Sequence, residues 1–300
     1  MILDFNNRIR GNRFLSEVIV TEPDSVQHRG EFESSCVGKS IEQCLSQGIP
    51  IIVCDAEAAV DTATRSALSF PIFCGTAIRS VLSFVVDLSD VDDQDNAMDR
   101  TGVFEVWTPR GLYQDLGLSS GYFGKLERFQ NVSSFVRFER GSGLPGQAWS
   151  LGRTVIHDNL KTHPGFLRAA GASADALQTA IGIPVFANNF VSAVVLISGL
   201  AAPIARSFEV WQPTDEGFEL IDRAYNGFDA EYQLAVGSRA TGRNELLDSV
   251  IESQSAVLFD DVASQWRDRR FNVDHAVPSP AVAIPTYAEN ELSCVTVLVL

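Results

Sequence analysis

Short runs of apolar residues recur along the chain, and the same runs return about every hundred residues. Residues 104–109 (FEVWTP) return as residues 208–213 (FEVWQP), 104 positions later. An aliphatic run that closes on aspartate occurs three times, ending at Asp55, Asp158 and Asp260. A repeat of this length is the size of a small domain. The pattern therefore predicts three copies of one domain. The expected copies cover residues 1–100, 101–205 and 206–300.

The middle copy gives the clearest pattern of elements. A short helix is expected from Pro145 to Trp149, because proline is favoured in the first turn of a helix. Residues 166–176 are rich in alanine and are expected to be helical. Short strands with helices inserted between them predict an α+β domain around a central antiparallel sheet. The expected strands cover residues 103–108 (ended by Pro109), 112–123, 133–140, 154–157, 177–186 and 191–198.

The middle copy resembles a GAF domain, a small-molecule sensing module. The resemblance rests on GSGLPGQAWSLGRTVIHDNL (residues 141–160), FLRAAGASADALQTAIGIPV (166–185) and SAVVLISG (192–199). It implies three GAF-like (profilin-like) repeats, each a central antiparallel sheet with short helices. The third copy keeps RNELLDSVIESQSAVLFDDV (243–262) without the Gly-Leu-Pro-Gly turn.

The first copy is shorter than the other two. Only 38 residues separate Glu17 from Asp55, whereas 53 separate Glu105 from Asp158. We expect this copy to be a reduced sheet with little room for a ligand. GAF domains in sensor kinases begin and end with long helices, and no such helices are expected here. The sheet faces that those helices would cover are expected to be covered by neighbouring copies or by a second chain in a dimer.

Composition narrows the classes of partner. The formal net charge is −15, and such an acidic surface repels phosphate backbones and anionic lipids. We therefore expect neither nucleic acid nor membranes as partners. No apolar stretch reaches the roughly 20 residues that a membrane span needs, and residues 1–13 do not form a signal peptide, so a cytoplasmic protein is expected. The chain has 5 cysteines and no Cys-x-x-Cys, and we expect the cysteines to act as small buried apolar residues.

The candidate ligand site lies in the middle copy. Arg168 follows Phe166 in a segment of small and apolar residues and could face an anionic ligand or pair with Asp158 or Asp175. His157 is a candidate because histidine titrates near neutral pH, and Trp149 is expected to be part of the core or the site. In the third copy, Arg269 lies in WRDRRF (266–271), shortly before Asp274-His275, and could receive an anion above Asp260 or belong to a solvated helix.

The resemblance to GAF domains does not imply a cofactor for this chain. A bilin needs a cysteine on the pocket helix, a cyclic nucleotide needs a signature that is missing, and 4 scattered histidines fit haem or iron poorly. We therefore expect no cofactor, no metal and no catalytic activity. The first hypothesis is a module that binds a small polar molecule or mediates protein–protein contacts, as a homodimer or with another protein, without an attached output domain. The alternatives are a purely structural scaffold and a GAF-type thiol reductase of free methionine sulfoxide.

Overall fold

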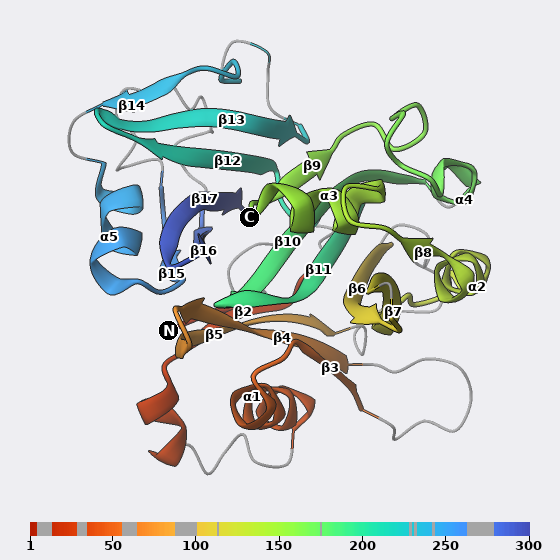
Figure 1. The fold of residues 1–300 in the computed structure, drawn as a ribbon, viewed down its shortest axis with the longest axis horizontal. Helices are drawn as coiled ribbons and strands as arrows, with labels where there is room; N and C mark the ends of the chain where they lie inside the picture. The colour runs from red at the N-terminus through yellow and green to blue at the C-terminus, as the bar shows by residue number, and fades with distance from the viewer. Residues whose placement is uncertain are drawn as a thin grey trace.

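The chain folds into three antiparallel sheets that meet around a common centre (Figure 1). Each sheet takes its strands from one of the three expected copies, within residues 2–87, 102–199 and 207–299. Short helices lie between the strands, and the α+β class expected from the sequence is confirmed. The structure is a computed structural model. It describes residues 1–4, 14–28, 35–55, 65–87, 101–112, 114–174, 176–227, 230, 233–241, 244–262 and 279–300.

The second sheet has six strands in the order β8-β7-β6-β11-β10-β9. Its longest strands, β10 and β11, form a hairpin that turns at Asn188 with a φ of 65°, a conformation that asparagine tolerates better than most residues. The strands are β6 (Gly102–Arg110), β7 (Asp115–Tyr122), β8 (Arg137–Phe138), β9 (Val155–His157), β10 (Leu177–Ala187) and β11 (Asn189–Gly199). The helices are α2 (Glu127–Phe135), α3 (Gly143–Leu151) and α4 (Ala169–Ala174).

The third sheet repeats this order, and the first sheet is a reduced form of it. Five strands in the order β1-β2-β5-β4-β3 make up the first sheet, in which β1 has 3 residues. Its elements are β1 (Ile2–Asp4), β2 (Glu17–Thr21), η1 (Pro23–His28), α1 (Cys36–Gln47), β3 (Ile51–Cys54), β4 (Arg65–Cys74) and β5 (Ala77–Asp87). Those of the third copy are β12 (Ser207–Thr214), β13 (Gly217–Tyr225), β14 (Arg239–Thr241), α5 (Glu245–Ser253), β15 (Val257–Phe259), β16 (Ala281–Ala288) and β17 (Glu291–Val299).

One apolar core joins the faces of the three sheets that carry no helix. Phe104 and Val106 of β6 lie in this shared core together with Phe208 and Val210 of β12. Trp107 lies on the other face of β6, in a separate core beneath the helices. This division follows from the alternation of side chains along a strand. The faces that lack terminal helices are therefore covered by neighbouring copies of the same chain.

The three proline motifs meet where the sheets converge. Strands β4, β10 and β16 contact one another pairwise. They surround a hollow of about 20 Å³ lined by Pro71, Pro184 and Pro285 with their neighbours. A hollow of this size holds about one water molecule. The repeated sequence thus produces a pseudo-threefold arrangement within a single chain.

The three copies also touch head to tail, as a closed ring. The edge strand of each copy lies against the next copy: β3 against β7 (the first joint), β9 against β13 (the second joint) and β15 against β2 (the third joint). At the second joint the backbone N–H of Thr154 donates to Cys294 Sγ at 3.5 Å. At the third joint the N–H of Ala256 donates to Ser80 Oγ at 3.3 Å. These two hydrogen bonds occupy equivalent positions.

The first joint lacks this hydrogen bond because of one proline. The strand registers make Pro50 the equivalent of the two donors and Ser192 the equivalent of the two acceptors. Proline has no N–H to donate. Ser192 Oγ is buried and has no hydrogen-bond partner among the described residues. At this position the first joint is therefore held by packing alone, whereas the second and third joints each have a hydrogen bond there as well.

Two details of the middle copy differ from the sequence-based expectation. Residues 133–140 were expected to form a strand, but α2 extends to Phe135 and β8 contains Arg137 and Phe138 alone. The helix buries Phe129 and Ser133, which are one helical turn apart. Pro109 does not end β6, because β11 pairs no further than Trp107 and proline is tolerated where one side of a strand has no partner.

The register of the first copy also differs from the expected one. In the first copy, Val81 of β5 pairs with Pro71 of β4 on one side and with Thr21 of β2 on the other. In the middle copy, Ala193 of β11 pairs in the same way with Pro184 of β10 and with Trp107 of β6. Thr21 therefore corresponds to Trp107, and Ile19, rather than Glu17, corresponds to Glu105.

Candidate functional site

The candidate site of the middle copy is built on an acidic residue inside an apolar strand. Glu105 lies in β6 with its side chain on the same face as Trp107, and it is completely buried. The indole Nε1–H of Trp107 donates to Glu105 Oε2 at 3.0 Å. The third copy repeats this contact, because Trp211 Nε1–H donates to Glu209 Oε2 at 3.0 Å. The repeated FEVW motif thus encodes a buried carboxylate held by the tryptophan two residues further on.

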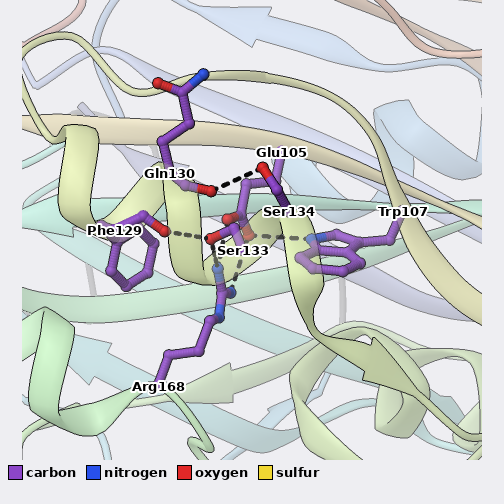
Figure 2. A network of polar contacts seen from close by, with 7 residues as sticks. All are labelled: Glu105, Trp107, Phe129, Gln130, Ser133, Ser134 and Arg168. Carbon is purple, nitrogen blue, oxygen red and sulfur yellow. Dashed lines mark hydrogen bonds and ion pairs between the residues drawn. The ribbon is translucent and has the colours of Figure 1, made fainter.

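Arg168 neutralises Glu105 in the interior of the middle copy. Its guanidinium approaches both carboxylate oxygens, donating through Nη1 to Oε1 and through Nη2 to Oε2, the latter at 2.9 Å. Nη1 also donates to Ser133 Oγ on α2. Figure 2 shows these side chains converging from α2, β6 and the segment before α4. The exposed fractions of the two charged side chains are 1% for Arg168 and 0% for Glu105.

Aromatic rings surround the guanidinium. Its central carbon lies 4.6 Å from the ring centroid of Phe129 and 5.3 Å from that of Phe166. Trp107 and Phe138 are slightly further away, at 5.4 and 5.9 Å. A cation placed over a ring face is attracted to it, most strongly where water is excluded. The pair is thus held by charge and by packing, and removing either partner would leave an uncompensated buried charge.

A second polar cluster lies on the other side of Phe166. His157, at the end of β9, is buried, and its ring stacks on His163 with centroids 3.9 Å apart. His157 Nε2 lies 3.1 Å from Gln147 Oε1, and Nδ1 has no hydrogen-bond partner among the described residues. Burial, together with the neighbouring His163, lowers the pKa of His157 to about 4. The imidazole is therefore neutral at physiological pH and leaves one buried nitrogen unsatisfied.

The structure brings some of the predicted site residues together and separates the others. Phe166 packs between Arg168 and His157. Asp158 is exposed and accepts hydrogen bonds from Asn159 N–H and Thr179 Oγ1, so the expected pair with Arg168 is wrong. The other expected partner, Asp175, lies outside the described residues.

Trp149 packs at the edge of the middle copy. It is partly buried and stacks on Phe190 with ring centroids 4.8 Å apart and an interplanar angle of 18°. The guanidinium of Arg140 also lies over the ring of Trp149, 5.5 Å from its centroid. Trp149 therefore supports helix α3 and is not among the rings that surround Arg168.

The third copy holds its buried carboxylate differently. Glu209 Oε1 accepts hydrogen bonds from Ser207 Oγ at 3.2 Å and from Tyr225 Oη at 3.0 Å. Asp260 is exposed at the end of β15. Arg269, the rest of residues 266–271, Asp274 and His275 lie outside the described residues. The expected anion site of this copy stays a prediction.

The first copy has neither member of this motif. Ile19 and Thr21 stand where the other copies have glutamate and tryptophan, and α1 covers the same face of the sheet. Burial, followed by the nearby Asp55, raises the pKa of Cys36 to about 12, and burial raises the pKa of Cys44. Cys54 is the last residue of β3 and is exposed, which corrects the expectation that it acts as a small buried residue. Among the described residues, no group of three or more His, Cys, Asp or Glu side chains is placed to hold a metal ion.

Sequence reasoning missed Glu105, Ser133, Gln147 and His163. Glu105 carried a signal, since an acidic residue in the apolar run VFEVW on the tryptophan face must find a partner once the strand is buried. Nothing in the spacing of the other three residues marks them, because α2, α3 and the segment after β9 bring them in from separate parts of the chain.

Comparisons with known proteins concern the fold alone. No family model matches the chain, and no curated protein matches it. Among solved structures, a free methionine-R-sulfoxide reductase from Neisseria meningitidis, solved with its substrate, is 18% identical with a TM-score of 0.26, covering 34% of this chain and 53% of the reductase. The nlh2 GAF domain of A. aeolicus is 17% identical with a TM-score of 0.27, covering 33% of this chain and 59% of that one. NreA of Staphylococcus aureus, mutated in its nitrate-binding site, is 12% identical with a TM-score of 0.29, covering 35% and 78%.

The matched part spans little more than half of the first two of these structures. None of the helices that the structure describes is long and apolar enough to cross a membrane. Each copy is a central antiparallel sheet with short inserted helices, as the resemblance of the middle copy implied. The chain therefore has an α+β fold repeated three times, with the layout that the resemblance of the middle copy to a GAF domain implied.

Proposed function

We propose that the protein is a non-catalytic interaction module whose middle copy is closed to ligands at Arg168. The observation that carries this proposal is the Arg168–Glu105 pair, in which the guanidinium already holds a carboxylate of the same chain. An anionic ligand would have to displace Glu105 and leave that carboxylate unpaired in a low-dielectric interior, at a cost of several kcal/mol, about 3–5 for a broken buried pair. The pair is thus better suited to holding α2 and α4 on the sheet than to exchanging ligands.

The outer surface of the middle copy supports a role in contacts between proteins. Phe135 at the end of α2 is 85% exposed, and Val132, one turn earlier, is 39% exposed. Leu167, just before α4, is 61% exposed. Exposed apolar side chains are common singly, but several on one layer of helices are typical of a surface that meets another protein.

The reductase alternative has less support. A catalytic thiol needs a lowered pKa, whereas burial raises the pKa of both Cys36 and Cys44. Cys54 is exposed and Cys74 is half-exposed, but Cys54 lies opposite Ser66 near one end of β4 and Cys74 lies at the other end, so neither thiol can resolve the other. We therefore propose no catalytic role for these cysteines.

Native mass spectrometry of the protein as purified tests the proposal. We expect the mass of the bare chain, 32.7 kDa, or of multiples of it, and no retained small molecule. Millimolar nitrate, acetate or phosphate should change the melting temperature of the wild type very little. The change should be equally small in Arg239→Met, a control that removes an exposed arginine paired with Glu216. A retained molecule that disappears in Arg168→Met would refute the closed site.

A second candidate function rests on the unsatisfied nitrogen of His157. A small molecule with a donor group, such as an amide or a hydroxyl, could bind to Nδ1 beside Gln147 and His163. Millimolar acetamide should then raise the melting temperature of the wild type and not that of His157→Leu, while His163→Leu would serve as the control for the stacked ring. Equal shifts in the wild type and in His157→Leu would reject this candidate.

A further inference from the structure

Charge is distributed unevenly among the three copies. Residues 101–205 contain 8 lysines and arginines and 6 aspartates and glutamates, so the middle copy has a formal net charge of +2. The formal net charge is −8 for residues 1–100 and −9 for residues 206–300. The middle copy is therefore the one copy of the three whose charge favours contact with an anionic partner.

Three arginines of the middle copy lie at the surface without an acidic partner. Arg110, Arg128 and Arg137 are exposed, and none of them forms an ion pair with any residue that the structure describes. Arg110 and Arg137 lie side by side over β7, because a Cβ atom at Gly117 would be 2.7 Å from Arg110 Cδ and 3.3 Å from Arg137 Nε. The glycine thus leaves room for two like charges, and an anionic group bound to both would offset their repulsion.

Large apolar side chains are exposed next to these charges. Phe135 and Val132 are the exposed large apolar residues of α2. Arg137 Nη1 donates to the backbone carbonyls of Ser134 at 3.2 Å and of Val136 at 2.8 Å. These two residues flank Phe135 in the chain, so the guanidinium of Arg137 lies beside the backbone that carries the exposed ring.

One side of α2 presents both kinds of side chain. Arg128, Val132 and Phe135 are four and three residues apart, so they follow one another along the helix surface. The residues that α2 buries lie on a different side of the helix. Figure 1 shows α2 at the outer edge of the middle copy, away from the third copy. We call this stripe, together with Arg110 and Arg137, the α2 face.

The sheet edge that follows α2 offers little for strand pairing. The edge strand of the second sheet is β8, which has 2 residues. Strand addition obtains its affinity from a row of backbone hydrogen bonds, and so short an edge provides few of them. A partner of the α2 face must therefore be recognised through side chains. A helix that packs along α2 meets a stripe of this spacing with its own residues at intervals of three and four.

We propose that the α2 face binds an amphipathic helix of a partner protein that carries acidic side chains beside large apolar ones. The apolar side chains of that helix cover Val132 and Phe135, and its carboxylates bind the guanidinium groups of Arg110, Arg128 and Arg137. The proposal rests on the proposed function, because it names the partner of the surface already described. An anionic membrane and a second copy of the chain are both disfavoured by the net charge of −15.

A designed acidic helix tests this proposal on the full chain. The probe is LEEFLEELEEFLEE with a fluorophore on its N-terminus, which places leucine and phenylalanine on one side of a helix and glutamate on the other. One control, LKKFLKKLKKFLKK, reverses the charge, and a second, AEEAAEEAEEAAEE, removes the large apolar side chains. Fluorescence anisotropy at low salt should give a Kd of about 10–500 μM for the probe and binding at least about tenfold weaker for each control. Equal binding of the probe and either control, or no binding of the probe, would overturn the proposal.

Two pairs of matched variants locate the binding. Phe135→Ser should weaken binding of the probe about tenfold or more, whereas Ile251→Ser, which removes an exposed apolar residue of α5, should leave it unchanged. Arg128→Glu should weaken binding about fivefold or more at low salt and less at high salt, whereas Arg239→Glu in the third copy should not. All four side chains are exposed, so the melting temperatures should stay close to that of the wild type. Equal effects within either pair would overturn the assignment to the α2 face.

Other outcomes identify a different occupant. If the wild type binds vesicles of phosphatidylcholine and phosphatidylserine and Phe135→Ser does not, the α2 face meets a membrane and the proposal is wrong. If the wild type dimerises and Phe135→Ser is monomeric by light scattering, a second copy of the chain covers the face and the proposal is also wrong. A retained small molecule at Arg168 would refute the closed middle site without affecting peptide binding. Failure of the peptide, with a bare middle copy, would refute the partner of the α2 face alone.

Discussion

Replacing Arg168 with methionine leaves the Glu105 carboxylate charged in the interior of the middle copy. The exposed fractions of the two side chains are 1% and 0%, so neither charge is screened by water. Breaking a buried pair by removing one partner costs about 3–5 kcal/mol of unfolding free energy. Glu105→Gln should cost about 2–4 kcal/mol, because the amide keeps the contact with Trp107 but leaves the guanidinium without its counter-charge.

The double variant decides whether these losses come from the pair itself. Arg168→Met/Glu105→Gln removes both charges and should be less destabilised than the sum of the single variants by about 2–3 kcal/mol. Urea unfolding followed by tryptophan fluorescence measures the midpoint, with the slope compared to verify that the unfolded surface is unchanged. Arg239→Met, which breaks an exposed pair with Glu216, should change stability by less than about 1 kcal/mol. Additive single losses, or a loss below about 1 kcal/mol for Arg168→Met, would refute the reasoning.

Three further predictions concern pH, the joints and the thiols. The pKa of His157 falls from 6.5 to about 4 on folding, so the folded chain binds fewer protons between these values. Stability should therefore be complete above about pH 6.5 and decrease by about 1–3 kcal/mol as the pH falls to 4, a dependence that His157→Gln should reduce in urea titrations. Ser80→Ala should lower the free energy of unfolding by about 1–2 kcal/mol, because it leaves the N–H of Ala256 unsatisfied. The equivalent Ser192→Ala should be neutral or stabilising in the same assay, since the hydroxyl of Ser192 has no partner among the described residues. Stability losses of equal size in the two variants would contradict the equivalence of the joints. Ellman's reagent should modify the exposed and half-exposed thiols at once and the buried ones only after denaturation, and fast reaction of all five would be contrary to this. The first group is Cys54 and Cys74, and the second is Cys36, Cys44 and Cys294.

Periodicity in the sequence predicted the repeated sheets because each copy carries its own strand pattern. The FEVW motif at residues 104–107 and 208–211 also predicts which side chains share a face, and the structure divides Phe104 and Trp107 between the two cores accordingly. Residues 133–140 were assigned to a strand because apolar and polar residues alternate there, but burial of Phe129 and Ser133 on one side of α2 favours the helix. In a segment this short, the pattern of apolar residues cannot distinguish the helical period of 3.6 residues from the strand period of 2.

The site was less accessible to sequence reasoning than the fold. Arg168 was singled out as a lone cation among small and apolar residues, but its partner lies 63 positions away in β6. The first sheet depends on a strand, β1, in a segment that showed no strand pattern, and on a register displaced by two residues from the one expected. Such features arise from how the copies pack against one another, and no single copy contains that information.

Linking the three sheets in one polypeptide has a consequence for stoichiometry. A trimer of identical subunits must repeat every feature three times, because each substitution appears at every symmetry-related position. Here each position of the ring is encoded separately, so Pro50, Thr154 and Ala256 differ although they occupy equivalent places. Concatenation therefore allows a single assembly to carry the buried Arg168–Glu105 pair in one copy and a carboxylate held by Ser207 and Tyr225 in another.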